Sequence, residues 1–146
     1  MPYSRNYPDT VAEVLREGKK YKADTLRAVK NLRRSKAWRG TLEEQQEKIK
    51  TLHQELCSIY NLRTVLEFIG HNGTEEDSGS SRFDSSIDKI YLSGRISVVT
   101  YLHEFAHARG MDERKACIWS INLFRRIFPN SYARCTHDSH MLRRAS

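Results

Sequence analysis

An H-E-x-x-H motif at His103 to His107 constrains the fold of this chain more than any other feature. Histidines four residues apart lie on one face of an α-helix, so both imidazoles can reach a single zinc ion. Glu104 directly follows the first histidine, and a carboxylate at that position can take a proton from an attacking water. The motif therefore predicts a metal-binding helix that packs its other face into the core.

Residues around the motif support this helix. Ser97 suits the N-cap position, because its hydroxyl can accept a hydrogen bond from a backbone N–H of the first turn. Gly110 can end the helix in a left-handed conformation. A core-facing stripe at helical spacing is formed by Val98, Val99, Leu102, Phe105 and Ala106. This division into a polar and an apolar face argues against two surface histidines that share a helix by accident.

A hydrolytic zinc site needs a third protein ligand and leaves its fourth position to water. A further helix is predicted from its N-cap Asp112 to about Phe128, where Pro129 stops it. Its buried stripe comprises Ala116, Trp119, Ser120, Leu123 and Ile127. Glu113 falls on the edge of this stripe and is the predicted third ligand. Asp112 is the alternative, and either acid could instead only cap the helix and compensate its dipole.

This arrangement resembles the zincin metallopeptidases. His103-Glu104-x-x-His107 followed by Glu113-x-x-Ala116 is similar to the small gluzincin-type branch that includes the ImmA/IrrE-like peptidases of bacteria and phages. The resemblance covers residues 41–129 in layout and about 99–128 in residue pattern. It implies a minimal zincin-like α+β domain in which His103, His107 and Glu113 hold Zn²⁺ and Glu104 is the general base. It also implies that an edge strand above the zinc helix holds the substrate backbone by strand addition.

The spacing from His107 to Glu113 departs from that branch, because it is very short for a gluzincin. It matches the metzincin pattern H-E-x-x-H-x-x-G-x-x-H, with Gly110 at the glycine and Glu113 in place of the third histidine. Met141 would then correspond to the methionine of the metzincin Met-turn. Both patterns select Glu113, and the subclass stays open.

The sequence before residue 41 is predicted to be a basic helical segment, and residues 41–146 the catalytic core. Capping boxes at Thr10 and Thr41 open two helices, the first running to about Lys36. The second carries an apolar stripe of Ile49, Leu52, Leu56 and Ile59. The core is expected to fold and bind zinc without residues 1–38, because every proposed ligand lies beyond them.

Basic residues dominate this N-terminal segment. They are Arg5, Arg16, Lys19, Lys20, Lys22, Arg27, Lys30, Arg33, Arg34, Lys36 and Arg39, against Asp9, Glu13, Glu17 and Asp24. Such a surface can attract nucleic acid or an acidic protein. The segment contains no recognisable nucleic-acid readout motif, and a basic helix face is often only solvated.

After residue 61 the sequence changes from helical to strand periodicity. Strands are predicted at Thr64–Ile69, near Ser81–Phe83 and at Lys89–Leu92, with a polar loop over residues 71–81. A small sheet followed by the metal helix and the ligand helix is an α+β arrangement.

The cysteines and the apolar stretches indicate the cellular compartment of the protein. Cys57, Cys117 and Cys135 form no C-x-x-C pair, and the first two are interpreted as small core residues. No stretch approaches eighteen apolar residues and the N-terminus is too polar for a signal peptide, so a cytoplasmic protein without membrane contact is predicted.

Together these features predict a zinc metallopeptidase that acts on a protein or peptide. Its oxyanion-stabilising residue is left open among Arg109, Tyr132, His137 and His140. Two other functions compete with this hypothesis. The chain could be a basic nucleic-acid-binding module with a non-catalytic metal site, or a regulatory module that binds peptides without cutting them. An intact Glu104 argues against both, because a structural metal site does not need it.

Overall fold

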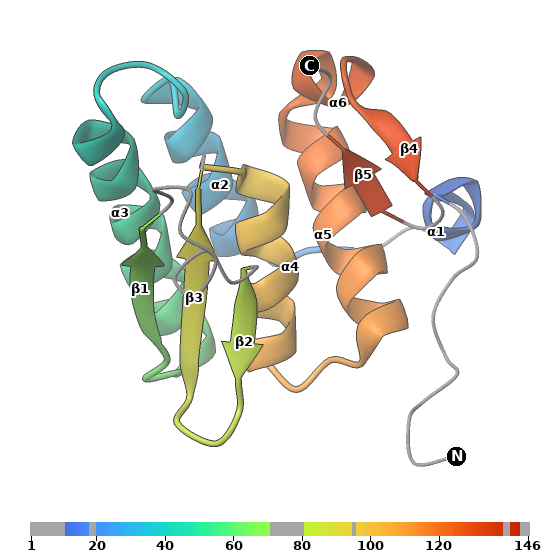
Figure 1. Ribbon diagram of the computed structural model, residues 1–146. Coiled ribbons are helices and arrows are strands. Elements are labelled where there is room, and N and C mark those ends of the chain that lie inside the picture. The colour runs from blue at the N-terminus through green and yellow to red at the C-terminus, as the bar shows by residue number, and fades with distance from the viewer. Residues whose placement is uncertain (1–10, 18–19, 71–80, 95, 139–140, 144–146) are drawn as a thin grey trace.

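Helices and a small sheet form a mixed α+β fold, as the sequence predicts (Figure 1). The computed structural model describes residues 11–17, 20–70, 81–94, 96–138 and 141–143. The helices are α1 (Val11–Glu17), α2 (Ala23–Arg34), α3 (Leu42–Tyr60), α4 (Val98–Ala108), α5 (Glu113–Ile127) and α6 (Pro129–Ala133). The strands are β1 (Val65–Ile69), β2 (Arg82–Asp84), β3 (Lys89–Ser93), β4 (Thr136–Asp138) and β5 (Met141–Arg143).

The predicted capping box of α3 is confirmed. The Thr41 hydroxyl accepts the Glu44 backbone N–H at 3.1 Å, and the Glu44 carboxylate accepts the Thr41 N–H at 2.9 Å. Asn61 ends the helix in the left-handed conformation, with φ of 56°. Three residues of the predicted stripe are fully buried: Ile49, Leu52 and Leu56. The helix therefore begins where the sequence predicts and turns its apolar side to the core.

Three strands form a mixed sheet in the order β1-β3-β2. β1 pairs parallel to β3 with Val65 opposite Lys89, and β2 pairs antiparallel to β3 with Phe83 opposite Ile90. In Figure 1, α3 and α4 cover one face of this sheet, and α4 packs against both β2 and β3. All three predicted strands are confirmed, whereas the predicted loop lies outside the described residues except for its last one. Within the part of the chain that the structure describes, β2 is thus an edge strand beside the helix of the motif.

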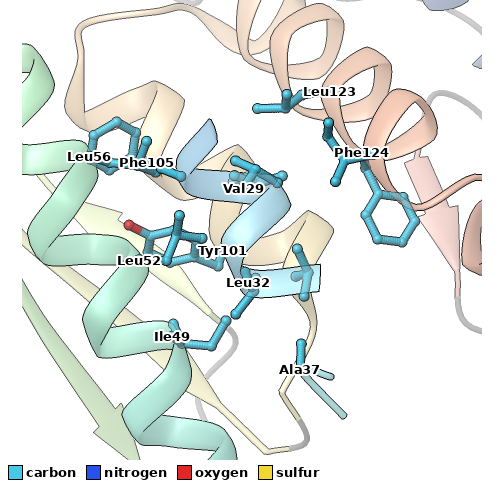
Figure 2. Close-up of a cluster of buried hydrophobic side chains, with 14 of the residues drawn as sticks. Val29, Leu32, Ala37, Ile49, Leu52, Leu56, Tyr101, Phe105, Leu123 and Phe124 are labelled. Atoms are coloured by element: carbon cyan, nitrogen blue, oxygen red, sulfur yellow. The ribbon is translucent and has the colours of Figure 1, made fainter. Parts of the chain in front are cut away.

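A common core joins α2, α3, α4 and α5. Figure 2 shows side chains of these helices, together with Ala37 from the turn after α2, gathered in one cluster; those labelled are Val29, Leu32, Ala37, Ile49, Leu52, Leu56, Tyr101, Phe105, Leu123 and Phe124. A second buried cluster joins α1 to α5 and comprises Val11, Val14, Cys117, Ile118 and Ile121. Both α1 and α2 therefore bury apolar side chains against the remainder of the chain.

The prediction of one long helix to about Lys36 is wrong. α1 ends at Glu17 and α2 begins at Ala23. Gly18 follows α1 in the sequence, and a glycine inside a helix costs about 1 kcal/mol relative to alanine. α1 packs against α5, whereas α2 packs against both α3 and α5, so two short helices reach different partners. The Thr10 capping box lies outside the described residues, and the division at residue 40 stays a prediction.

A buried histidine connects α3 to α4. The Nε2–H of His53 donates to the Thr64 carbonyl at 2.7 Å, and its Nδ1 accepts the Tyr101 hydroxyl at 2.7 Å. Burial is the main cause that lowers the pKa of His53 below its usual value. Because Tyr101 belongs to α4 and is fully buried, the neutral imidazole helps to fix the helix that carries the motif.

The C-terminal end contains structure that the sequence analysis did not predict. α6 begins at Pro129, where the missing N–H of proline is tolerated. β4 and β5 then pair antiparallel, with His137 opposite Leu142. No helix among the described residues combines the length and apolar character needed to cross a bilayer.

Candidate metal centre

Helix α4 forms as the sequence predicts. The Ser97 hydroxyl accepts the Thr100 N–H at 3.3 Å and caps its first turn. The side of α4 that faces the core buries Val98, Tyr101, Leu102, Phe105 and Ala106. This packing fixes the rotation of the helix and leaves His107 and Glu104 on its partly exposed side, with His103 at the border, 7 % exposed.

A Schellman turn ends α4 and reverses the chain. The Met111 N–H donates to the Ala106 carbonyl at 3.1 Å, and the Gly110 N–H donates to the His107 carbonyl at 2.8 Å. Gly110 has a φ of 91°, and a Cβ there would meet no atom within 4 Å. The left-handed backbone, and not lack of space, therefore explains the glycine. α5 begins only three residues later, at Glu113.

Asp112 and Glu113 have different partners. The Asp112 carboxylate accepts the Lys115 N–H at 2.8 Å and so caps α5. The first residue of the helix, Glu113, directs its carboxylate toward the two histidines. The structure thus gives Asp112 the capping role and Glu113 the place of the predicted third ligand.

Three atoms that could bind a metal ion converge at the motif. Oε1 of Glu113 lies 3.0 Å from Nε2 of His103 and 3.0 Å from Nε2 of His107. The two Nε2 atoms lie 3.2 Å apart. His103 is buried, and the other two residues are half-buried, so solvent reaches the cluster from one side.

These separations fit a metal ion. Tetrahedral zinc with bonds of about 2.0–2.2 Å places its ligand atoms roughly 3.3–3.6 Å apart. The observed 3.0–3.2 Å requires only a small outward movement of the three side chains. Two imidazoles and a carboxylate also form the donor set of a hydrolytic zinc site that keeps one position open. The residues present therefore fit the predicted metal.

A backbone carbonyl orients His107. Its Nδ1–H donates to the Met111 carbonyl at 2.9 Å, which leaves the lone pair of Nε2 directed at the cluster. The hydrogen bond to Glu113 is the main cause that raises the pKa of His107. The Schellman turn supplies this carbonyl, so one backbone feature positions both His107 and Glu113.

Cys117 lies beside His103 and Glu113 and belongs to a second possible set of metal ligands. One ligand atom each from His103, Glu113 and Cys117 lies within 4.8 Å of the others. Sγ, however, lies 3.9 Å from Nδ1 of His103 and 3.6 Å from Oε2 of Glu113. These are the atoms of the two side chains that do not face the cluster. Burial, followed by the nearby Glu113, strongly raises the pKa of the thiol, whereas a metal needs the thiolate. We therefore favour the set with His107.

The sequence pattern around Cys117 predicts only a core residue. It is indeed fully buried, but it also contacts two proposed ligands. Its position one turn after Glu113 on the same helix was the available signal, because residues at i and i+4 are neighbours.

Glu104 lies between α4 and the edge strand β2. The backbone N–H of Phe83 hydrogen-bonds its carboxylate, and the side chain is half-buried. Burial is the main cause that raises the pKa of Glu104, and His103 and His107 partly oppose it. A carboxylate with a raised pKa beside a cluster of donors has the properties of a general base.

Of the four oxyanion candidates, the structure describes the side chains of Arg109 and Tyr132 only. The guanidinium of Arg109 lies 3.8 Å from the centre of the Tyr60 ring, in a cation–π contact. Tyr132 packs against both apolar clusters. His137 lies in β4 with its side chain outside the described structure, and His140 lies outside the described residues.

No protein-family model matches the chain, and no curated protein or solved structure matches it either. We therefore infer the function from the geometry of the side chains.

Proposed function

We propose that this chain is a zinc-dependent peptidase with a zincin-like site. The observation that carries the proposal is the position of Glu113 Oε1, 3.0 Å from Nε2 of both motif histidines. A general base, Glu104, lies on the same helix as the histidines and beside an edge strand.

Each residue has a distinct role in this mechanism. His103, His107 and Glu113 hold the metal, and Met111 keeps His107 in the required tautomer. When bound, zinc supplies a Lewis acid that polarises the scissile carbonyl and makes water more acidic. Glu104 accepts the proton of the attacking water and delivers it to the departing amine. Its raised pKa makes Glu104 a stronger base for the first transfer than an ordinary carboxylate.

The substrate of this mechanism is an extended peptide. Among the described residues, β2 pairs with β3 on one side only, and it packs against α4. The edge of such a strand can pair with the backbone of another chain whatever its sequence, which suits a protein or peptide substrate.

Elemental analysis and a cleavage assay test the proposal together. The purified protein should contain one zinc per chain and cut a fluorescently labelled unfolded protein. Glu104→Gln should retain the zinc and lose cleavage, because an amide cannot accept the proton. Absence of stoichiometric metal in the parent protein, or parental cleavage by the Glu104→Gln variant, would overturn the proposal.

A second function is favoured by the surface of α2. Arg27, Lys30 and Arg34 lie along the side opposite the buried residues and are exposed. Asp24 is the one acid of this helix and pairs with Arg27 at 3.1 Å. We propose that this basic stripe contacts nucleic-acid phosphates, in agreement with the net charge of +7.

Binding of a DNA oligonucleotide at several salt concentrations tests this second function. The affinity should fall steeply with salt, and Lys30→Glu with Arg34→Glu should weaken it at low salt. Lys50→Glu on α3 is the matched control, because Lys50 already pairs with Glu47 at 3.0 Å. Equal affinity of the stripe variants and the parent would refute the contact.

A further inference from the structure

The thiol of Cys117 lies where α5 meets the metal-binding helix. Cys117 follows Glu113 by one helical turn and is fully buried. Its Sγ lies 3.6 Å from Oε2 of Glu113, on the same helix, and 3.9 Å from Nδ1 of His103, on α4. A single sulfur atom therefore touches two of the three proposed ligands.

The contacts are made to the atoms that do not face the metal position. Oε1 of Glu113 and Nε2 of His103 point toward each other, 3.0 Å apart, while Oε2 and Nδ1 point toward the sulfur. An ionised carboxylate can only accept hydrogen bonds, so the thiol is the donor to Oε2. This arrangement fixes which carboxylate oxygen faces the histidines.

We propose that Cys117 is a positioning residue for the metal site. Its S–H holds Oε2 of Glu113, and its sulfur packs against the Nδ1 edge of His103, so both ligands are oriented before a metal binds. The inference rests on the proposed function, because it deepens the description of the same site. Met111 orients His107 from the backbone, and Cys117 performs the corresponding task for the other two ligands.

Removal of the partner that orients a ligand usually weakens metal binding about 10- to 100-fold. We therefore expect Cys117→Ala to bind zinc about tenfold more weakly than the parent, measured by competition with a chromophoric chelator. Cys117→Ser should retain most of the affinity, because a hydroxyl also donates. Ile121→Val is the matched control for loss of core volume, because Ile121 lies in the same buried cluster and one turn farther along α5. It should leave the affinity unchanged.

Two results of the zinc-affinity measurements would overturn the inference. The first is parental zinc affinity in Cys117→Ala. The second is an equal loss in the serine and alanine variants, which would show that hydrogen bonding by the side chain is unimportant. Thermal unfolding of each metal-free variant shows whether it is folded, so that a lower affinity is not mistaken for loss of structure.

A measurement on metal-free protein separates this inference from the proposed function. The infrared S–H band of Cys117, obtained as the difference between the parent and Cys117→Ser, reports the hydrogen bond without zinc. Glu113→Ala should move this band to higher frequency, because the acceptor is lost. An unmoved band would refute the positioning role. If the parent binds no zinc and the band still moves, the metal proposal fails and the contact between Cys117 and Glu113 stands.

Discussion

Substitution of two neighbouring acids separates helix capping from metal binding. Asp112 caps α5 through the Lys115 N–H, while Glu113 meets the histidines. Loss of an N-cap costs about 0.5–2 kcal/mol, which corresponds to about 1–8 °C in Tm for a domain near 150 residues. Asp112→Ala should therefore lower the Tm of the metal-free protein.

Zinc should raise the Tm of one variant and have little effect on the Tm of the other. A ligand at a hundredfold excess over its Kd stabilises the folded state by about 2.7 kcal/mol, or about 5–11 °C here. Asp112→Ala should keep this increase in Tm, because the proposed ligand atoms of His103, His107 and Glu113 are unchanged. Glu113→Ala should lose most of the increase, because one of the three proposed ligands is missing.

Calorimetry with and without zinc measures both effects on the same samples. A chelator-treated sample of each protein provides the metal-free Tm, and His103→Ala serves as a control for loss of a ligand. The ligand assignment would be refuted if Asp112→Ala lost the zinc-dependent increase and Glu113→Ala retained it.

Three further changes test other parts of the structure. Gly110→Ala should cost about 1–2 kcal/mol in urea unfolding of metal-free protein, because its backbone is left-handed, and an unchanged stability would contradict this. His53 has a lowered pKa in the folded state, so its contribution to stability is full above about pH 6.5 and is lost as the pH falls from there toward the folded-state pKa. A His53→Gln variant should show a smaller decrease in unfolding free energy between pH 7.5 and 5.5 than the parent, and an equal decrease would refute the assignment. Deletion of residues 1–38 should abolish cooperative unfolding in calorimetry, contrary to the expectation from sequence, because each buried Val or Leu of α1 and α2 contributes about 1.5–3 kcal/mol; a retained cooperative transition would support the boundary at residue 40.

The elements predicted correctly are those with signals in neighbouring residues. Thr41 with Glu44, and Ser97 before an apolar stripe, specify helix starts through caps that form within three residues. The three strands follow from short runs of β-branched and aromatic residues. Alternation of burial along β3, where Ile90 and Leu92 are buried, agrees with this periodicity.

The features that the sequence did not predict correctly depend on contacts between residues far apart in the chain. The break between α1 and α2 accompanies packing of two short helices against different partners, which a loose apolar pattern does not encode. Cys117 belongs to an apolar stripe by its spacing, and its contact with His103 depends on how α5 crosses α4. Pairing of β4 with β5 involves segments too short to show strand periodicity.

The backbone geometry explains how the short segment from His107 to Glu113 brings these two side chains together. Six residues are few for a proposed ligand on a following helix. Because of this short spacing, the sequence resembles both the gluzincin-type and the metzincin pattern. The left-handed Gly110 turns the chain back within one turn, so that Glu113, as the first residue of α5, reaches both Nε2 atoms. The same turn presents the Met111 carbonyl to Nδ1 of His107. The carboxylate of Glu113 therefore needs no longer loop to reach the motif, and the glycine is required by the turn that brings it there.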